Sequence, residues 1–453
     1  MDSLHRLGKN SATYDKLDLQ FAQCCTTASL PPYPKQFGHE RLITANAWQM
    51  LGNGPNTVSP EFQAPSDCVF VRGDHKPMLR TLKRLSVLVV VMLALLWGTG
   101  AMPEESDPGQ AYRRVNLVSD IAGVARFTDE NLVNPWGLAF SPTSPFWVAD
   151  NGSGVSTLYN GRGQAFPVGS PLVVTIPSPT SPTGGTPTGL VFNSTEDFVV
   201  SANGKSGPSS FLFATEDGTI LGRSSAVDPT QAIIAVDNSG AGAVYKGLAI
   251  ASTPNGNFLY ATNFSAGVVE MYDKNFDLKT TFTDTNVDPD FAPFGIQNIG
   301  GQLYVTFALQ KLPDKHDDEA GTGNGFVDVF APDGTLLRRV ASHGTLNSPW
   351  GLALAPDGFG AFSDHLLVGN FGDGRINAFD VRRDAFDSQL RDPQGNPLTI
   401  NGLWALQFGT GSPNGGGRHT LFSLRASPTS RTACSVLYGP DTKKTRKTDA
   451  NNL

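Results

Sequence analysis

The sequence predicts an all-β protein, a six-bladed β-propeller with four-stranded blades. Three observations predict this fold: a motif of about 50 residues that recurs six times, short apolar strands between turn residues, and a turn-rich composition. The 453 residues include 49 glycines and 32 prolines, which is above average usage but below the content of a low-complexity chain. This composition excludes a collagen, a disulfide-knotted miniprotein and a fully disordered polypeptide.

The repeats begin with a glycine that opens an apolar strand, as in Asn134-Pro-Trp-Gly-Leu-Ala and Ser348-Pro-Trp-Gly-Leu-Ala. The recurring glycines are spaced 48 to 58 residues apart: Gly137, Gly189, Gly247, Gly295, Gly351 and Gly402. Second strands are predicted over 146–151, 198–203, 258–263, 303–307 and 366–370, mostly ending in Asn. Third strands are clearest over 267–273, 325–330 and 374–380, where side chains alternate as in a half-buried strand. Such units pack radially around an axis.

The ring of blades needs a closing strand, and the segment 112–119 lies where it can provide one. Its sequence, Tyr-Arg-Arg-Val-Asn-Leu-Val-Ser, precedes the first repeat. We therefore expect it to pair with the last blade.

A short apolar run at 85–97 resembles a membrane span but has only thirteen residues, whereas about 20 cross a bilayer as a helix. Arg80, Lys83 and Arg84 precede it and small residues up to Ala101 follow it, as in a secretory signal peptide. We predict a signal peptide at 78–101 and an exported protein, periplasmic, cell-surface or extracellular, without a stable membrane span after cleavage. The alternative is a signal anchor with 1–77 in the cytoplasm.

The two ends of the chain differ from the repeats. Residues 1–77 show no sustained period, which indicates a disordered upstream extension, with Met78 as the natural start. After Phe422 the sequence lacks the Gly-rich turn and apolar strand that should finish the sixth blade. We therefore predict the propeller over 102–425, with an incomplete last blade, and an aberrant, disordered tail over 426–453.

The predicted body is acidic and free of cysteine. Residues 102–425 carry 19 basic and 32 acidic side chains, a net charge of −13. Such a surface repels phosphate backbones, so nucleic acid is not an expected partner. All four cysteines lie outside this range, so the fold must be held by its core and its sheet pairing. We expect a monomer.

The pattern of repeats resembles the NHL-type and streptogramin-lyase-like six-bladed propellers. The Gly-Leu-Ala strand starts, the Pro-Asp-Gly turns and the strand ends in Asn carry the resemblance. More closely, Asn134-Pro-Trp-Gly-Leu, Gly325-Phe-Val-Asp-Val-Phe and Asn401-Gly-Leu-Trp-Ala-Leu-Gln-Phe-Gly look like an uncharacterised family of exported propellers. The resemblance covers about 112–423 and implies the fold but no particular activity.

Two rings of residues are candidates for ligand binding, because equivalent positions of all blades meet at the channel mouth. The first consists of asparagines at the second-strand ends: Asn151, Asn203, Asn263 and Asn370. They fit a cation or a polar ligand, but also a structural role as turn caps. The second consists of residues before the repeat glycines: Trp136, Thr188, Lys246, Phe294, Trp350 and Asn401. They predict an aromatic slot with one cationic group, suited to a sugar, a lactone or an aromatic ligand; the alternative is packing between blades.

An acidic loop interrupts the fourth repeat and is the candidate metal site. Asp314, Asp317, Asp318 and Glu319 lie within six positions, and clustered oxygen ligands suit a divalent cation such as Ca²⁺. The spacing is not that of an EF-hand, and acidic loops are also common as plain solvated loops.

Two functions remain open from the sequence. The first is an exported binding or scaffold protein whose channel mouth takes a small polar or glycan ligand, or which engages an envelope protein. The second is a metal-dependent hydrolase or lyase of the lactonase or streptogramin-lyase type. The sequence contains no G-x-S-x-G, H-E-x-x-H, Walker A or dinucleotide-binding motif, which favours the first.

Overall fold

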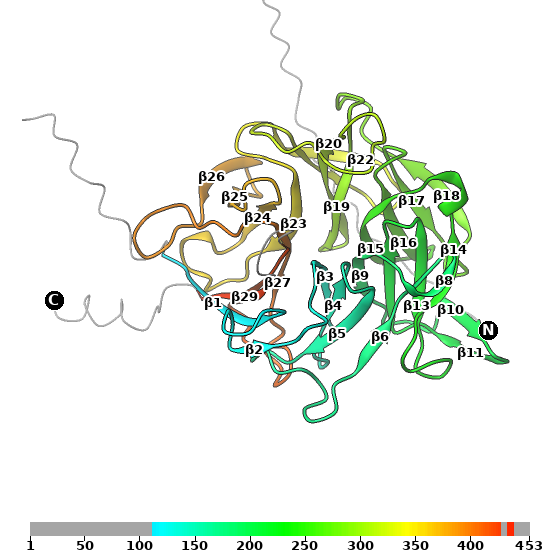
Figure 1. Ribbon diagram of the computed structural model, residues 1–453. Coiled ribbons are helices and arrows are strands. Elements are labelled where there is room, and N and C mark those ends of the chain that lie inside the picture. The colour runs from blue at the N-terminus through cyan, green and yellow to red at the C-terminus, as the bar shows by residue number, and fades with distance from the viewer. Residues whose placement is uncertain (1–110, 427–432, 439–453) are drawn as a thin grey trace, which may run out of the picture. The chain divides into compact units, whose positions relative to one another are not determined.

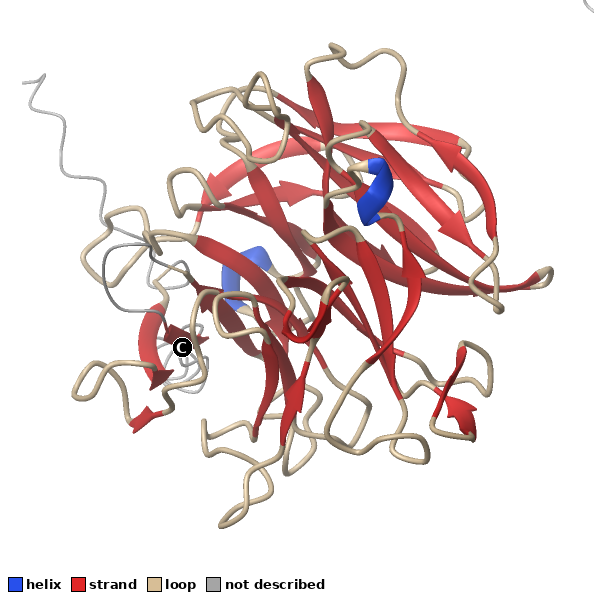
Figure 2. Cartoon of the chain, turned by 45° about the vertical axis from the view of Figure 1, so that its right-hand side comes forward, coloured by secondary structure: helices blue, strands red, loops and turns tan. Residues whose placement is uncertain are grey.

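Six sheets, antiparallel except for one short parallel edge pair, surround a common centre, as predicted from the repeats (Figure 1). The computed structural model describes residues 111–426 and 433–438. The predicted extension 1–77, the predicted signal peptide 78–101, and 427–432 and 439–453 of the predicted tail lie outside these residues. Strands account for nearly all regular structure in the described part, and its helices are two short 3₁₀ turns, η2 (Ser239–Ala241) and η3 (Gly360–Phe362) (Figure 2). No helix among the described residues is long and apolar enough to span a membrane.

The first three blades take their strands in chain order from the channel outward. Blade 1 contains β3 (Pro135–Ala139), β4 (Phe146–Asp150), β5 (Val155–Tyr159) and β6 (Val173–Thr175). Blade 2 contains β9 (Pro187–Phe192), β12 (Phe211–Thr215), β13 (Thr219–Arg223) and β14 (Ile233–Asp237). Blade 3 contains β15 (Tyr245–Thr253), β16 (Gly256–Asn263), β17 (Val268–Tyr272) and β18 (Leu278–Phe282).

Two further complete blades and a closing blade follow. Blade 4 contains β19 (Phe291–Ile299), β20 (Gln302–Leu309), β21 (Phe326–Phe330) and β22 (Leu336–Ser342). Blade 5 contains β23 (Pro349–Leu354), β24 (His365–Asn370), β25 (Ile376–Asp380) and β26 (Ala385–Gln389). Blade 6 contains β27 (Leu403–Phe408), β28 (Thr420–Arg425), β29 (Ala433–Tyr438) and β1 (Arg113–Ser119), with β2 (Phe127–Thr128) at its edge.

The N-terminal strand closes the ring, as the sequence predicts. β1 pairs antiparallel with β29, with Arg113 opposite Tyr438, so the two ends of the propeller share one sheet. β29 lies within 426–453, the range predicted to be a disordered tail. That prediction is wrong for Ala433–Tyr438, because these residues form the third strand and complete the blade. The sequence Ala-Cys-Ser-Val-Leu-Tyr shows no alternation, because the strand lies between β28 and β1 and its first five residues are all buried.

A β-hairpin is inserted into blade 2 and changes the expected strand assignment. β10 (Val199–Ala202) pairs only with β11 (Lys205–Pro208), and the second strand of the blade is β12. The prediction of the second strand over 198–203 is therefore wrong. A second small hairpin, β7 (Pro177–Ser178) with β8 (Ser181–Gly184), precedes the same blade.

The hydrophobic core lies between neighbouring blades. Trp147 of blade 1 stacks on Phe211 of blade 2, with ring centroids 4.2 Å apart, and both side chains are buried. The repeat glycines allow the innermost strands to approach closely. A Cβ at Gly295 would lie 2.1 Å from the Trp350 carbonyl oxygen, and one at Gly351 would lie 2.4 Å from that of Trp404. Glycine therefore recurs because a side chain at this position would collide with the next blade.

Candidate functional site

The start of each innermost strand and the end of the second strand lie together at one mouth of the central channel. Pro135 pairs with Asp150, Tyr245 with Asn263, Pro293 with Phe307, and Pro349 with Asn370. Pro187 and Leu403 pair in the same way with Thr215 and Arg425. This register fixes which residues of different blades are equivalent.

The register corrects the predicted ring of asparagines. Asp150, not Asn151, is equivalent to Asn263 and Asn370, so Asn151 is displaced by one position. One residue beyond the paired ends, the structure forms what we call the outer ring: Asn151, Glu216, Phe264, Ala308, Phe371 and Ala426. Sequence reasoning missed Glu216, because the inserted hairpin hides the true second strand of blade 2.

The asparagines other than Asn151 serve the fold. Asn263 donates to the buried Glu270 carboxylate (2.7 Å) and accepts from the backbone of Val244 and Ala266. Asn370 is buried and donates to the Thr345 carbonyl (2.8 Å). These contacts match the structural alternative of a turn cap.

Asn203 does not reach the channel. It is exposed at the turn between β10 and β11, with a φ of 54°. The prediction that it shares a ring with the other asparagines is wrong, because its strand belongs to the inserted hairpin.

The residues before the repeat glycines gather at the same mouth and are all buried, as an inner ring: Trp136, Thr188, Lys246, Phe294, Trp350 and Trp404. Trp404 takes the place predicted for Asn401, which is exposed. In the sixth repeat Ala405 corresponds to the recurring glycine, whereas Gly402 has a φ of 70° in the preceding turn. The Trp-x-Leu spacing shared by Trp350-Gly-Leu and Trp404-Ala-Leu is the signal that would have identified it.

Aromatic rings of blades 1, 5 and 6 form a continuous stack at this mouth. Trp136 stacks on Trp404 with centroids 3.5 Å apart, and Phe371 stacks on Trp404 at 4.1 Å. Trp350 meets both tryptophans edge to face, and its indole N–H donates to the Lys246 carbonyl (3.1 Å). The indole N–H groups of Trp136 and Trp404 are buried without an acceptor among the described residues.

Lys246 places a positive charge inside this aromatic mouth. Its side chain is 2% exposed, and its ammonium group contacts the Glu216 carboxylate and lies 3.9 Å from Asp317 Oδ1. The same ammonium lies 5.1 Å from the ring centroid of Trp136 and 6.0 Å from that of Phe264. A buried cation needs such partners, because desolvation would otherwise be costly.

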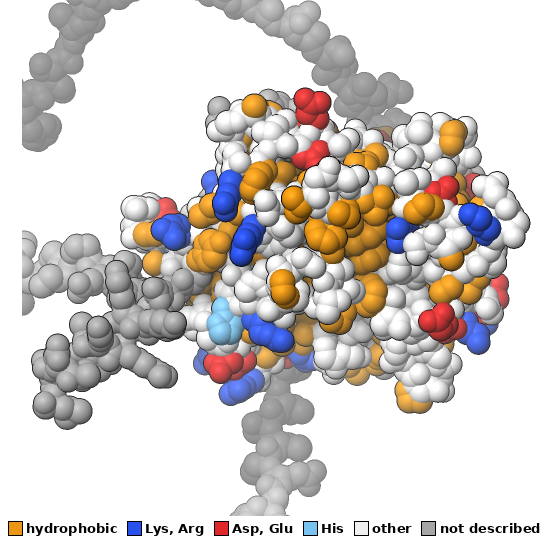
Figure 3. Space-filling model, turned by 90° about the horizontal axis from the view of Figure 1, so that it is seen from below, with side chains coloured by type: hydrophobic (Ala, Val, Ile, Leu, Met, Phe, Trp, Pro, Cys, Tyr) orange, Lys and Arg blue, Asp and Glu red, His pale blue; other side chains and the backbone are white. Residues whose placement is uncertain are grey.

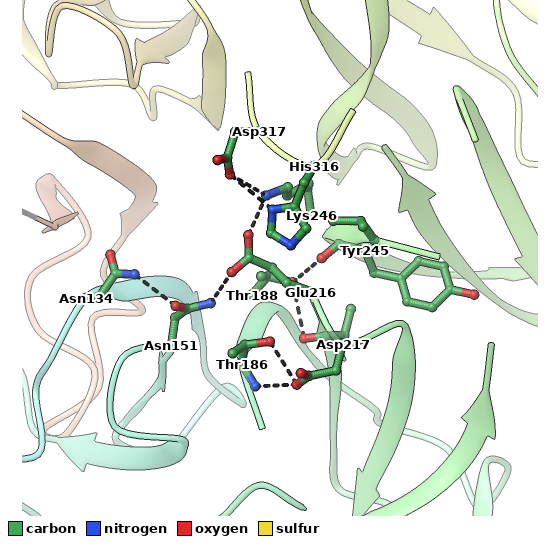
Figure 4. Close-up of polar contacts among 12 residues, drawn as sticks. Asn134, Asn151, Thr186, Thr188, Glu216, Asp217, Tyr245, Lys246, His316 and Asp317 are labelled. Atoms are coloured by element: carbon green, nitrogen blue, oxygen red, sulfur yellow. Dashed lines mark hydrogen bonds and ion pairs between the residues drawn. The ribbon is translucent and has the colours of Figure 1, made fainter. Parts of the chain in front are cut away.

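A chain of polar contacts fixes Glu216 (Figure 4). Asn151 donates to Glu216 Oε2 (2.8 Å) and accepts from Asn134 Nδ2 (2.9 Å). Asn151 therefore orients the counterion of Lys246. Blades 1, 2 and 3 are tied together by these contacts.

The acidic loop of blade 4 reaches the same mouth. The Gln310 side chain donates to the Phe264 carbonyl of blade 3, and the Lys311 N–H donates to the Asp317 carbonyl. The Asp317 side chain is exposed. Partial desolvation would raise its pKa, but the hydrogen bond with His316 and the positive charge of Lys246 have the larger effect and lower it. Burial raises the pKa of the Asp318 carboxyl, and the nearby Ser348 hydroxyl partly offsets this effect. Neither Asp318 Oδ2 nor Ser348 Oγ makes a hydrogen bond of good geometry among the described residues.

A cavity of about 570 Å³ opens at this mouth. Its lining includes aromatic side chains, the two carboxylates of the loop and two lysines: Trp136, Phe371, Trp404, Asp317, Asp318, Lys246 and Lys311. Farther along the channel the free space narrows to about 30 Å³ between the inner strands. The cavity is therefore a pocket with an aromatic wall and a charged rim.

The predicted metal ligands are only partly brought together. Asp317 and Asp318 line the cavity, whereas Asp314 and Glu319 are exposed and do not line it. Among the described residues, potential ligand atoms of Glu216, His316 and Asp317 lie within 4.8 Å of one another. The Lys246 ammonium contacts two of these three residues, Glu216 and Asp317. The negative charge that a metal ion would neutralise is therefore already balanced in part by a lysine.

Comparisons with known proteins identify relatives of the chain. No known family model matches it. "Uncharacterized protein R648" of Acanthamoeba polyphaga mimivirus is 33% identical over 298 residues, which is 64% of this chain and 72% of the relative. "Uncharacterized protein L690" of the same virus is 33% identical over 302 residues, covering 64% and 77%. The chain belongs to the family of these mimivirus proteins. Membership of the R648 family confirms the predicted relationship to uncharacterised proteins and assigns no activity.

Two solved structures similar to this member of the R648 family have low sequence identity to it. Virginiamycin B lyase from Staphylococcus aureus is 14% identical with a TM-score of 0.43, covering 72% of this chain and 98% of the lyase. Aldose sugar dehydrogenase from Escherichia coli is 13% identical with a TM-score of 0.44, covering 73% and 100%. The assignment of a six-bladed propeller rests on the strand order itself, and similarities at this level say nothing about activity.

Proposed function

We propose that the protein binds a small polar organic ligand in the cavity at the channel mouth. The observation that carries this proposal is the cavity, whose volume of about 570 Å³ is in the usual range for small-molecule sites. Its wall is aromatic, and its polar lining consists of six residues: Asp120, Asn134, Lys246, Lys311, Asp317 and Asp318. Among them, the Lys246 ammonium lies 3.9 Å from Asp317 Oδ1. Apolar walls with a few placed polar groups are typical of ligand sites.

The alternative, a metal-dependent hydrolase or lyase, has less support. It requires a cation that polarises a carbonyl group. The carboxylates best placed to hold one, Glu216 and Asp317, are shared with the Lys246 ammonium. A divalent ion there would lie beside a buried positive charge, which is electrostatically unfavourable.

Tryptophan fluorescence offers a direct test, because three of the four described tryptophans, Trp136, Trp350 and Trp404, lie at this mouth. The full-length protein is titrated with a panel of sugars, amino acids, amines and organic acids, and hits are measured by calorimetry. We expect Phe371→Ala to weaken binding at least tenfold. Phe386→Ala is the matched control, because Phe386 is 46% exposed on the outermost strand of the same blade. Binding that is unchanged by Phe371→Ala would place the ligand elsewhere.

We also propose that the protein is exported, which the signal-like segment 78–101 supports. On the side shown in Figure 3, hydrophobic side chains gather near the centre, and the Lys and Arg side chains around them form no continuous patch, so the surface is poorly suited to nucleic acid. Expression from Met78 in a secreting host tests the proposal. A mature chain that starts near Met102 is expected, whereas an unprocessed cytoplasmic product would contradict it.

A further inference from the structure

We infer that the ligand of the channel-mouth cavity is a hydroxylated organic ammonium ion, such as an amino alcohol or an amino sugar. This inference rests on the proposed function and adds the charge of the ligand. Three independent features of the cavity carry it: its balance of charge, its aromatic stack and its unpaired polar atoms.

The charge balance leaves the cavity negative. Three carboxylates line it, those of Asp120, Asp317 and Asp318, and Glu216 adjoins it through Lys246. Two lysines oppose these four groups, and the ammonium of Lys246 is already neutralised by Glu216. When all are ionised, the site has a net charge of −2, which one ligand cation would partly neutralise.

The aromatic stack is arranged to accept a cation. At one end, Trp136 has the Lys246 ammonium 5.1 Å from its centroid. At the other end, Phe371 is half-buried, stacks on Trp404 through one face and lines the cavity. Organic cations are attracted to such aromatic faces, and more strongly where the site is desolvated.

The unpaired polar atoms specify what else the ligand carries. Asp318 Oδ2 is a buried acceptor that makes no hydrogen bond of good geometry, although the Ser348 hydroxyl lies near it, and an ammonium N–H or a hydroxyl of the ligand would supply a donor. The indole N–H groups of Trp136 and Trp404 are donors without an acceptor, on side chains that are 5% and 2% exposed. Unpaired buried polar groups are costly, so a ligand that has both a cationic donor and a hydroxyl oxygen would satisfy both kinds.

Matched pairs of cationic and neutral compounds test the inference. Choline is compared with 3,3-dimethylbutan-1-ol, which has the same shape without the charge, and glucosamine with glucose, by calorimetry on the full-length protein. We expect at least one of the cations to bind at least tenfold more tightly than its neutral partner. We expect Asp318→Asn to reduce this preference about tenfold, whereas Asp333→Asn, in an exposed turn, leaves it unchanged.

The outcomes separate the inference from the proposed function. If a neutral compound binds as tightly as its cationic partner, the inferred charge is wrong while the cavity remains a ligand site. If no member of either pair binds but the wider panel yields an anionic or neutral ligand sensitive to Phe371→Ala, the inference is also wrong. If nothing in the panel binds, the proposed function itself fails. Thermal unfolding of Asp318→Asn verifies that the variant is folded.

Discussion

The ammonium group of Lys246, on the first strand of blade 3, contacts the carboxylate of Glu216, which follows the second strand of blade 2. Among the described residues, the other ion-pair partner of Lys246 is Asp317, whose side chain is 64% exposed, whereas that of Glu216 is 13% exposed. The pair joins two blades at the channel mouth and holds the Lys246 ammonium near the rings of Trp136 and Phe264.

Removing the cation of this pair should destabilise the protein. Lys246→Met leaves the Glu216 carboxylate, 13% exposed, without its counterion, and breaking a buried pair in this way costs about 3–5 kcal/mol. Urea unfolding measures the change. Lys279→Met is the control, because Lys279 is 51% exposed and its pair with Asp273 is worth at most about 1 kcal/mol. A Lys246→Met protein as stable as the wild type would contradict the role of the pair.

Calcium should not stabilise the wild-type protein. The Lys246 ammonium supplies the positive charge that Glu216 and Asp317 would otherwise take from a metal ion. Adding millimolar Ca²⁺ or a chelator is therefore expected to leave the midpoint of thermal unfolding unchanged, since a ligand stabilises only what it binds. A stoichiometric, tightly held ion in elemental analysis of the purified protein would instead restore the hydrolase or lyase alternative.

The repeat glycines should not tolerate even a methyl group. In Gly295→Ala the new Cβ would lie 2.1 Å from the Trp350 carbonyl oxygen, so the inner strands of blades 4 and 5 must separate. We expect a loss of at least about 3 kcal/mol in the free energy of unfolding, the upper range for overpacking. Gly240→Ala, where a Cβ would meet nothing within 4 Å, should change it by less than about 0.5 kcal/mol. Equal effects at the two sites would show that blade spacing is not set by this contact.

Strand β29 should contribute to global stability. Leu437 is fully buried and packs in a cluster with Leu421 and Leu406, so Leu437→Ala is expected to cost about 2–5 kcal/mol in denaturant unfolding. Tyr438 is 41% exposed, and Tyr438→Ala should cost far less. If Leu437→Ala has no effect, the propeller ends before this strand, as the sequence alone predicted.

Asp328 in blade 4 should titrate well above an ordinary aspartate. Burial raises its pKa to about 6 although the Arg339 side chain bonds it at 2.7 Å. Because the folded pKa exceeds the ordinary value of 3.8, the protonated group contributes stability below about pH 4, and this is lost as the pH rises through 6. NMR titration of the carboxyl carbons measures the pKa directly. Arg339→Met should raise it further, since the cation that favours the carboxylate is gone; a titration below pH 4 in the wild type would refute the assignment.

The sequence by itself determined the number of blades, the glycines at the innermost strands of five of them and the closing role of 112–119. These features can be recognised locally, because the repeats contain a glycine where two backbones meet, a turn such as Pro-Asp-Gly and a strand with alternating side chains. It also placed Trp136, Lys246, Phe294 and Trp350 at one end of the channel, because equivalent positions in repeated units must meet around the axis.

Tertiary structure alone decided which polar residues share the site. Asn151 is one position out of register with Asn263 and Asn370, and a shift of one residue moves a side chain to the other face of a strand. Glu216 lies at the mouth because the second strand of blade 2 is β12, which follows an inserted hairpin, and β29 is held on both sides, by β28 and by β1 more than 300 residues away. Strand pairing is a long-range interaction, so the local pattern of side chains cannot specify it.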